Sequence, residues 1–211
     1  MIHALVPIKP LAEAKTRLAT LLTPQQRRAL ALAMFEDVLA ALVATPEVAA
    51  VSVIGGDALT RQQAEFYGAR AVADPRALNQ ALTQAAAQTW ARGQRPLIVF
   101  ADLPLATPAE LGELTAHNAV ADIVLAGAPD GGTNAMLCAP TMPLLFGSGS
   151  LAHHLRAAEQ RGLRAKVLDL PGLARDIDRP EDIWWLAEHG VATRAGRLAQ
   201  SLIERQEETL Q

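Results

Sequence analysis

Three aspartates have the residue type and the spacing to bind a divalent cation. Asp102 comes just after the apolar run 97–100, and Asp176 and Asp178 are separated by a single residue. Carboxylate oxygens are the ligands that Mg²⁺ prefers, and carboxylate-bound Mg²⁺ is the usual equipment of reactions on triphosphates. Two other interpretations stay open: Asp102 as a turn residue, and Asp178 as the N-cap of the following helix, with Glu181 completing a capping box.

Three cations, Lys9, Lys15 and Arg17, follow the first predicted strand within nine residues. Such a segment could neutralise a bound polyphosphate. The alternative is a solvated helix face on which Glu13 and Arg17 pair four residues apart. The sequence lacks G-x-x-x-x-G-K-[ST], and it lacks G-x-G-x-x-G after the first strand. We therefore expect neither a P-loop ATPase nor a nicotinamide-dependent dehydrogenase.

Two turns rich in small residues, 131–134 and 147–150, offer backbone N–H donors. The second turn leads directly into a predicted helix, so that its N–H groups and the helix N-terminus could hold a phosphate or a carboxylate. An ordinary turn with Ser150 as N-cap explains the same pattern. We interpret His153 and His154 as surface or packing residues, and Cys138 as a small buried apolar residue.

The elements that must position these groups alternate between strands and helices. Apolar runs predict strands at residues 2–8, 48–54, 71–73, 97–100, 122–126, 134–139 and 165–170. Helical patterns cover residues 24–44, a segment ending at 66, 78–91, a segment from 108, 150–161 and a segment from 180, followed by a polar helical tail at 190–211. This order favours one three-layer α/β domain over residues 1–211 with a mostly parallel sheet. In such sheets ligands bind beyond the carboxyl ends of the strands, where the cations and Asp102 lie.

Composition excludes several classes of protein. The chain has 211 residues, 50% of them hydrophobic, 19% charged and 4% aromatic, with a formal net charge of -3. A chain of this length buries roughly 70% of its unfolded surface, so we expect a real core. No apolar run reaches the length of about 18 residues that would indicate a membrane span, and the N-terminal segment does not resemble a signal peptide. The single cysteine excludes an internal disulfide, the charge does not favour nucleic-acid binding, and we expect a cytoplasmic protein.

Taken together and in order, the motifs resemble those of the phospholactate guanylyltransferase family, which is similar to the wider MobA-like nucleotidyltransferases. They are VPIK (6–9), AKTRL (14–18), LNQAL (78–82), ADLPL (101–105), GTNA (132–135), FGSGS (146–150) with His154, and DIDRPED (176–182). The resemblance implies a single Rossmann-like, GT-A-like domain with a mostly parallel mixed sheet. It also implies transfer of GMP from GTP to the phosphate of a small phosphorylated carboxylic acid, with release of diphosphate, in biosynthesis of the deazaflavin coenzyme F-420. Acceptors in the family are 2-phospholactate, phosphoenolpyruvate and 3-phosphoglycerate.

Carried over position by position, the resemblance assigns roles to individual residues. The Mg²⁺ ligands would be Asp102, Asp176 and Asp178. The groups facing the GTP phosphates would be Lys9, Lys15 and Arg17, with Asn79 at the nucleoside end. The groups holding the carboxylate and phosphate of the acceptor would be Thr133, Gly147 and Ser150.

Two other functions stay open. A MobA-like enzyme with a molybdopterin or sugar-phosphate acceptor shares the fold, although such relatives usually carry a glycine-rich first loop where this chain has Pro-Ile-Lys-Pro at 7–10. A non-catalytic nucleotide-binding module would bind GTP without releasing diphosphate. Trp184, Trp185 and the helical tail permit a homodimer.

Overall fold

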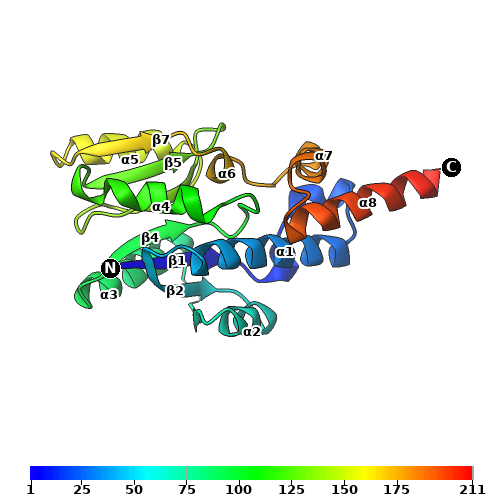
Figure 1. The fold of residues 1–211 in the computed structure, drawn as a ribbon, viewed down its shortest axis with the longest axis horizontal. Helices are drawn as coiled ribbons and strands as arrows, with labels where there is room; N and C mark the ends of the chain where they lie inside the picture. The colour runs from blue at the N-terminus through cyan, green and yellow to red at the C-terminus, as the bar shows by residue number, and fades with distance from the viewer. Residues whose placement is uncertain (75, 211) are drawn as a thin grey trace.

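The computed structural model describes residues 1–74 and 76–210, with side chains up to residue 206. Its centre is a mixed sheet (Figure 1) in which the described strands follow the order β3-β2-β1-β4-β6-β5-β7. The strands are β1 (Ile2–Ile8), β2 (Val48–Gly55), β3 (Arg70–Val72), β4 (Arg95–Val99), β5 (Ile123–Gly127), β6 (Thr133–Leu137) and β7 (Ala165–Leu168). All neighbours are parallel except β6, which runs antiparallel to both β4 and β5. The prediction of a mostly parallel mixed sheet is confirmed.

Helices cover both faces of this sheet. They are α1 (Pro24–Val43), α2 (Ala58–Phe66), α3 (Leu78–Ala91), α4 (Pro108–Ala116), α5 (Ser150–Glu159), α6 (Pro171–Ala174), α7 (Pro180–His189) and α8 (Arg194–Leu210), with 3-10 turns at Leu11–Glu13, Thr16–Thr20 and His117–Ala119. Because successive strand residues point to opposite faces, Ala4 and Val6 pack with α1 and α4, whereas Leu5 packs with α3. Two apolar cores, one on each face, therefore separate three layers.

Local sequence signals set several helix starts. The hydroxyl of Thr23 accepts from the N–H of Gln26, and the side chain of Gln26 accepts from the N–H of Thr23. Thr107 and Glu110 form the same reciprocal cap. Both helices also have a proline at their first position, where no intrahelical N–H is needed. The two capping boxes fix the starts of α1 and α4, which agree with the helices predicted from residues 24 and 108.

A third apolar cluster lies beyond the end of the sheet, where α7 and α8 pack against the first half of α1 (Figure 1). Leu18 from the segment after β1, Met34 from α1 and Leu186 from α7 are fully buried there, and Leu202 of α8 is nearly so. The predicted helical tail is confirmed as α8, and it contributes side chains to this core. Of the helices described, none has both the length and the apolar character needed to cross a membrane.

The strand order of the sheet reverses at β1. The chain passes from β1 to β2 and β3 on one side, then crosses to β4 on the other side of β1. A crevice for ligands forms beyond the carboxyl ends of two neighbouring parallel strands whose following connections run to opposite sides of the sheet. In this chain that place lies between the segment after β1 and the segment after β4.

Candidate active site

The three aspartates predicted as a cation site meet at this place. One carboxylate oxygen from each of Asp102, Asp176 and Asp178 lies within 4.8 Å of the others, and all three residues are half-buried. Asp102 comes from the segment after β4, and the other two come from the segment between α6 and α7. The N–H of Ile177 donates to the carbonyl oxygen of Asp102 at 3.3 Å, which fixes the two segments side by side.

A buried lysine bridges two of these carboxylates. The Nζ atom of Lys15 lies 2.7 Å from Oδ2 of Asp102 and 2.9 Å from Oδ1 of Asp178, and the Lys15 side chain is only 6% exposed. Burial alone would lower the pKa of Lys15, but the charges of Asp102 and Asp178 outweigh it and the pKa is raised. Lys15 therefore carries an ammonium group between two carboxylates.

The backbone of Lys15 is in the left-handed region, with φ of 53° and ψ of 39°. A side chain with a Cβ rarely adopts this conformation, which costs about 1–3 kcal/mol when it is held. The two turns on either side of Lys15 are short 3-10 helices, so the left-handed residue forms the corner between them. We infer that the two ion pairs of its side chain offset this local cost.

The interpretation of residues 9–18 as a solvated helix face is wrong. Glu13 and Arg17 belong to different 3-10 turns, and Nη1 of Arg17 pairs with Oδ2 of Asp178 at 2.9 Å. Lys9 is exposed just after β1. Its charge is still close enough to contribute to the lowered pKa of Asp178. All three predicted cations thus lie around the carboxylates.

The interpretation of Asp178 as an N-cap is also wrong. Its carboxylate accepts from Lys15 and Arg17 instead. Arg179 is the N-cap of α7, and the carboxylate of Asp182 accepts from the N–H groups of Asp178 and Arg179 at 3.0 and 2.8 Å. Asp182, and not the predicted Glu181, therefore completes the capping box of this helix. The carboxylate of Asp178 is not needed as a cap and faces the site.

The three aspartates differ in their electrostatic surroundings. Burial together with the charges of Asp102 and Asp178 raises the pKa of Asp176 to about 6. Burial would also raise the pKa of Asp178, but the charges of Lys15 and Arg17 outweigh it and the pKa is lowered. Among the described residues no ion pair involves Asp176. Three convergent oxygen donors, one of them without an ion pair among the described residues, fit a hard divalent cation.

A second group of predicted residues lies at the start of β6 and of α5. Thr133 and Ser150 are both buried, and Oγ of Ser150 has no hydrogen-bond partner among the described residues. Ser150 is not the N-cap, as one interpretation had it: Gly149 is, with φ of 66° and no side-chain cap. Gly147 also has a positive φ, of 144°, which an L side chain adopts only with strain. The turn thus presents backbone and one unsatisfied buried hydroxyl at a helix N-terminus, which suits an anion.

The predicted nucleoside contact, Asn79, uses its amide within the protein. Its Nδ2 donates to the carbonyl oxygen of Phe146 at 3.0 Å, and its Oδ1 accepts from the N–H of Phe146 at 2.9 Å. Asn79 therefore fastens the turn before Gly147 to the start of α3. Its predicted role at the nucleoside end stays a prediction.

His154 belongs to this group as well, although the sequence indicated only a surface or packing role. Its ring is fully buried, with Nδ1 at 3.0 Å from Oγ1 of Thr133 and Nε2 accepting from the N–H of Leu145 at 2.9 Å. The ring of Phe146 packs edge-on against it. Two signals were available: His154 accompanies the FGSGS motif in the family resemblance, and it follows Ser150 by four residues on the same helix face.

The neutral state of His154 predicts a loss of stability in mild acid. Burial, with a smaller effect of His153, lowers the pKa of His154 to about 4. Between about 6.5 and 4 the unfolded chain binds a proton that the folded chain does not, so the free energy of unfolding falls as the pH drops through this range. The full shift corresponds to about 3 kcal/mol. In urea titrations at about pH 7 and about pH 5, the decrease should be smaller in His154→Gln than in the wild type, and an equal decrease would contradict this assignment.

Cys138 is buried, as predicted, and burial raises the pKa of its thiol to about 12. On α7, Trp185 stacks on His189 and lies under the guanidinium of Arg175, whereas Trp184 is 47% exposed.

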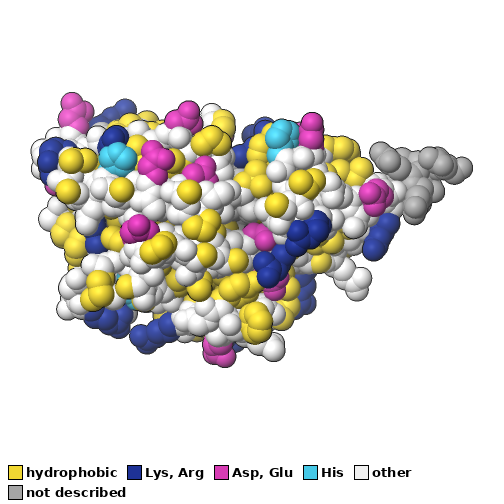
Figure 2. All heavy atoms as spheres, in the orientation of Figure 1, with side chains coloured by type: hydrophobic (Ala, Val, Ile, Leu, Met, Phe, Trp, Pro, Cys, Tyr) yellow, Lys and Arg dark blue, Asp and Glu magenta, His cyan; other side chains and the backbone are white. Residues whose placement is uncertain are grey.

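Acidic and basic side chains are interspersed on the face drawn in Figure 2, and neither sign dominates it.

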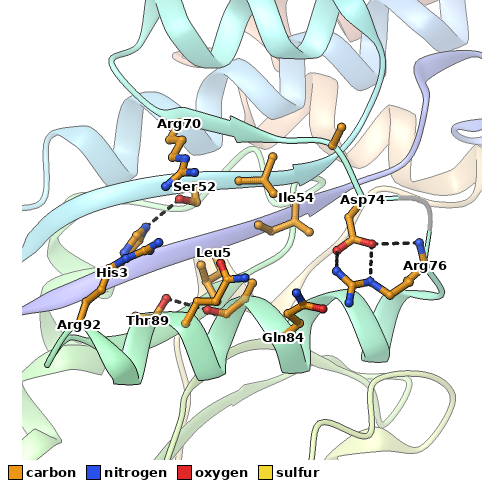
Figure 3. A pocket seen from close by; sticks show the side chains of 14 residues that line it. His3, Leu5, Ser52, Ile54, Arg70, Asp74, Arg76, Gln84, Thr89 and Arg92 are labelled. Atoms are coloured by element: carbon orange, nitrogen blue, oxygen red, sulfur yellow. Dashed lines mark hydrogen bonds and ion pairs between the residues drawn. The ribbon is translucent and has the colours of Figure 1, made fainter.

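A cavity of about 250 Å³ lies elsewhere, between α3 and strands β1 to β3 (Figure 3). None of the three aspartates lines it. Its polar groups contact one another: His3 bonds to the Ser52 hydroxyl at 2.8 Å, and Asp74 pairs with Arg76. The cavity therefore adds no group to the cluster around Lys15.

Comparisons with known proteins point to one kind of chemistry. Residues 2–204 match the family model described as "Guanylyl transferase CofC like". The chain is 44% identical over 209 residues to a phosphoenolpyruvate guanylyltransferase of Roseiflexus sp. (strain RS-1), covering 97% of this chain and 93% of the relative. It is 35% identical over 202 residues to a 2-phospho-L-lactate guanylyltransferase of Methanothermobacter thermautotrophicus, covering 94% of this chain and 90% of the relative.

Solved structures share the fold at low identity. A protein of Desulfovibrio desulfuricans G20, provisionally described as a nucleotide-diphospho-sugar transferase, superposes with a TM-score of 0.79 at 16% identity and 97% coverage of both chains. The 4-diphosphocytidyl-2C-methyl-D-erythritol synthase of Anaerococcus prevotii gives a TM-score of 0.62 at 11% identity, covering 95% of this chain and 96% of that chain. The α/β architecture with a seven-stranded sheet is thus one that nucleotidyltransferases use.

Proposed function

The chain belongs to the CofC-like guanylyl transferase family, and we propose that it transfers GMP from GTP to the phosphate of a small phosphorylated carboxylic acid, with release of diphosphate, in biosynthesis of the deazaflavin coenzyme F-420. The observation that carries the proposal is the meeting of Asp102, Asp176 and Asp178 around Lys15 at the switch point of the sheet. Among acceptor acids we place phosphoenolpyruvate first, because relatives at 44% and 40% identity are named for it.

We assign Mg²⁺ to the three carboxylates. All the donors are oxygens, they converge within 4.8 Å, and the pKa of Asp176 is raised by burial and by the charges of Asp102 and Asp178, which a cation would offset. When bound, Mg²⁺ would neutralise charge on the triphosphate and align its phosphates. Lys15 and Arg17, which lie against the same carboxylates, hold fixed positive charge at the place where the GTP phosphates would bind.

The chemical step makes and breaks one bond at the α-phosphorus. An oxygen of the acceptor phosphate attacks that atom, the bond to the bridging oxygen of the β-phosphate breaks, and diphosphate leaves with the electron pair. The attacking phosphate is largely ionised near neutral pH, so no general base is needed. The contribution of the chain is then positioning and charge stabilisation.

The acceptor acid would bind at the second group of residues. Thr133 and Ser150 contribute hydroxyl groups, and Gly147 and the N-terminus of α5 contribute backbone. The start of β6 is tied to the catalytic segment, because Nδ2 of Asn134 donates to the carbonyl oxygens of Leu173 and Ala174, both at 3.0 Å. This tie joins the acceptor residues to the segment that carries Asp176.

The test is diphosphate release from GTP and Mg²⁺ with phosphoenolpyruvate, 2-phospholactate or 3-phosphoglycerate. An enzyme that consumes the guanylylated product is added, because such a product could be unstable or inhibitory. We expect turnover to be fastest with phosphoenolpyruvate. A matched reaction with CTP in place of GTP should be far slower. Binding of GTP without diphosphate release with any of these acids would favour a different acceptor, such as a molybdopterin or a sugar phosphate, or a nucleotide-binding module.

Two further assignments are proposals. We place the protein in the cytoplasm, because its single cysteine is free and buried, as is typical of a reducing compartment. We also propose a homodimer in which the half-exposed Trp184 of α7 is a contact residue. Sedimentation of the wild type and of Trp184→Ala measures this, and a monomeric wild type would contradict it.

A further inference from the structure

A buried histidine connects the three segments that carry the proposed acceptor residues Thr133, Gly147 and Ser150. His154 lies on α5, its Nδ1 contacts Oγ1 of Thr133 at the start of β6, and its Nε2 contacts the N–H of Leu145 in the segment before Gly147. The side chain of Asn79 holds the next residue of that segment. The ring therefore contacts Thr133 directly and holds the segment that leads into Gly147.

The contact with Leu145 determines which ring nitrogen carries the proton. A backbone N–H can only donate, so Nε2 of His154 must offer its lone pair to Leu145. In a neutral imidazole the other nitrogen then carries the hydrogen, and Nδ1–H donates to Oγ1 of Thr133 at 3.0 Å. Burial keeps the ring neutral, because it lowers the pKa of His154 to about 4.

This direction of donation decides what the Thr133 hydroxyl can do. Its oxygen accepts from His154, and within the described residues its own proton has no acceptor. The proton is therefore available to a ligand. If the ring carried its proton on Nε2 instead, Thr133 would donate its only proton to Nδ1 and would present a ligand with lone pairs alone.

We propose that His154 is a positioning residue that makes Thr133 a hydrogen-bond donor to an anionic oxygen of the acceptor acid. This inference rests on the proposed function. A second donor is the buried Ser150 hydroxyl, which has no partner among the described residues. Ser150 lies one helical turn before His154 on α5. A site built from neutral hydroxyls and a helix N-terminus accepts anionic oxygens, and it disfavours an analogue in which that oxygen is replaced by an amide nitrogen.

Two substitutions separate the two contacts of the ring. In His154→Gln the side-chain oxygen can reach the position of Nε2 and accept from Leu145, but the donor to Thr133 is lost. In His154→Asn the amide nitrogen takes the position of Nδ1 and can donate to Thr133, but the acceptor for Leu145 is lost. The exposed neighbour gives the matched control, His153→Gln.

The measurement is the KM for each substrate, from diphosphate release with GTP, Mg²⁺ and phosphoenolpyruvate or 2-phospholactate. We expect His154→Gln to raise the KM for the acid by about tenfold or more, the effect of one hydrogen bond to a charged group, and to leave the KM for GTP unchanged. His154→Asn should recover most of the lost affinity for the acid even if its melting temperature is lower. His153→Gln should match the wild type.

The outcomes distinguish a failure of the proposed function from a failure of the role assigned to His154. If the wild type turns over none of the three acids, 3-phosphoglycerate included, the proposed function is wrong and this inference falls with it. If the wild type is active and His154→Gln shows an unchanged KM for the acid, or raises both KM values equally, the inference is wrong while the proposed function stands. A His154→Asn variant with the same defect as His154→Gln also overturns it, because a merely structural role would not be rescued by donor position.

The tautomer can be read in the wild type, so that the test does not require a substitution of His154 itself. Long-range proton–nitrogen NMR correlations of histidine-labelled protein distinguish a protonated Nδ1 from a protonated Nε2. The signals of His154 are assigned by replacing the other four histidines one at a time. We expect a proton on Nδ1, and a proton on Nε2 overturns the proposal.

Discussion

Asp102→Asn is expected to lower kcat/KM for GTP by at least about a thousandfold, the scale of losing a main charge-stabilising group in a site of this kind. The substitution keeps the shape of the side chain and removes one of three cation ligands and one partner of Lys15. Lys15 keeps Asp178 as its other partner, so we expect the variant to fold. Diphosphate release measures activity, and circular dichroism with a melting curve measures folding.

Asp176→Asn separates the loss of a ligand from the loss of an ion pair. Asp176 is one of the three ligands, but no ion pair of the described residues involves it, and its pKa is raised by burial and by the two neighbouring carboxylates. We therefore expect activity to fall as far as in Asp102→Asn, while the melting temperature without divalent cations stays the same or rises. Such a trade of stability for function is common at active sites.

The matched control for both is Asp122→Asn. Asp122 pairs with Arg164 at the start of β5, at the opposite end of the strands from the cluster. This variant loses a carboxylate and an ion pair without touching the three ligands, so its kcat/KM should equal that of the wild type. Near-normal activity in Asp102→Asn or Asp176→Asn would show that the three carboxylates do not form the catalytic cation site.

Much of the fold is visible in the sequence because its signals are local. The capping boxes at Thr23 and Thr107 set helix starts within one residue, and the apolar run before Asp102 marks the buried central strand. The carboxyl ends of such strands meet at one edge, so that strand position indicated where Asp102 and the three cations would gather. The grouping of Asp176 and Asp178 with Asp102 came from the spacing of the carboxylates and from the family resemblance.

The details of the site depend on contacts between residues far apart in sequence, which spacing does not indicate. Asp178 looks like a cap, but Asp182 satisfies the N–H groups at the start of α7, so that the Asp178 carboxylate is free to pair with Lys15, 163 residues away. The left-handed backbone of Lys15 likewise does not follow from a local preference of lysine, and it accompanies ion pairs with Asp102 and Asp178. His154 has its role because Thr133 and Leu145 reach it from other segments.

The largest effect on stability is expected from Lys15→Met, which keeps the length of the side chain and removes its charge. Without divalent cations, Asp102 loses its ion pair with Lys15, Asp178 keeps only the exposed Arg17, and both lie beside Asp176. Breaking a buried ion pair by removing one partner costs about 3 kcal/mol, and we expect the free energy of unfolding to fall by this amount. Urea titration in EDTA measures it, and Lys166→Met, at an exposed position of β7, should behave as the wild type.

The same substitution tests how Lys15 and Mg²⁺ share the carboxylates. The ammonium of Lys15 occupies oxygens of two of the three proposed ligands, so that in the wild type it competes with a cation for them. In Lys15→Met this competitor is gone and the cluster is more negative, so added Mg²⁺ should raise the melting temperature further than it does in the wild type. GTP turnover should still be low, because the positive charge facing the phosphates is missing. Equal stabilisation of both proteins by Mg²⁺ would mean that the cation does not bind at the carboxylates held by Lys15.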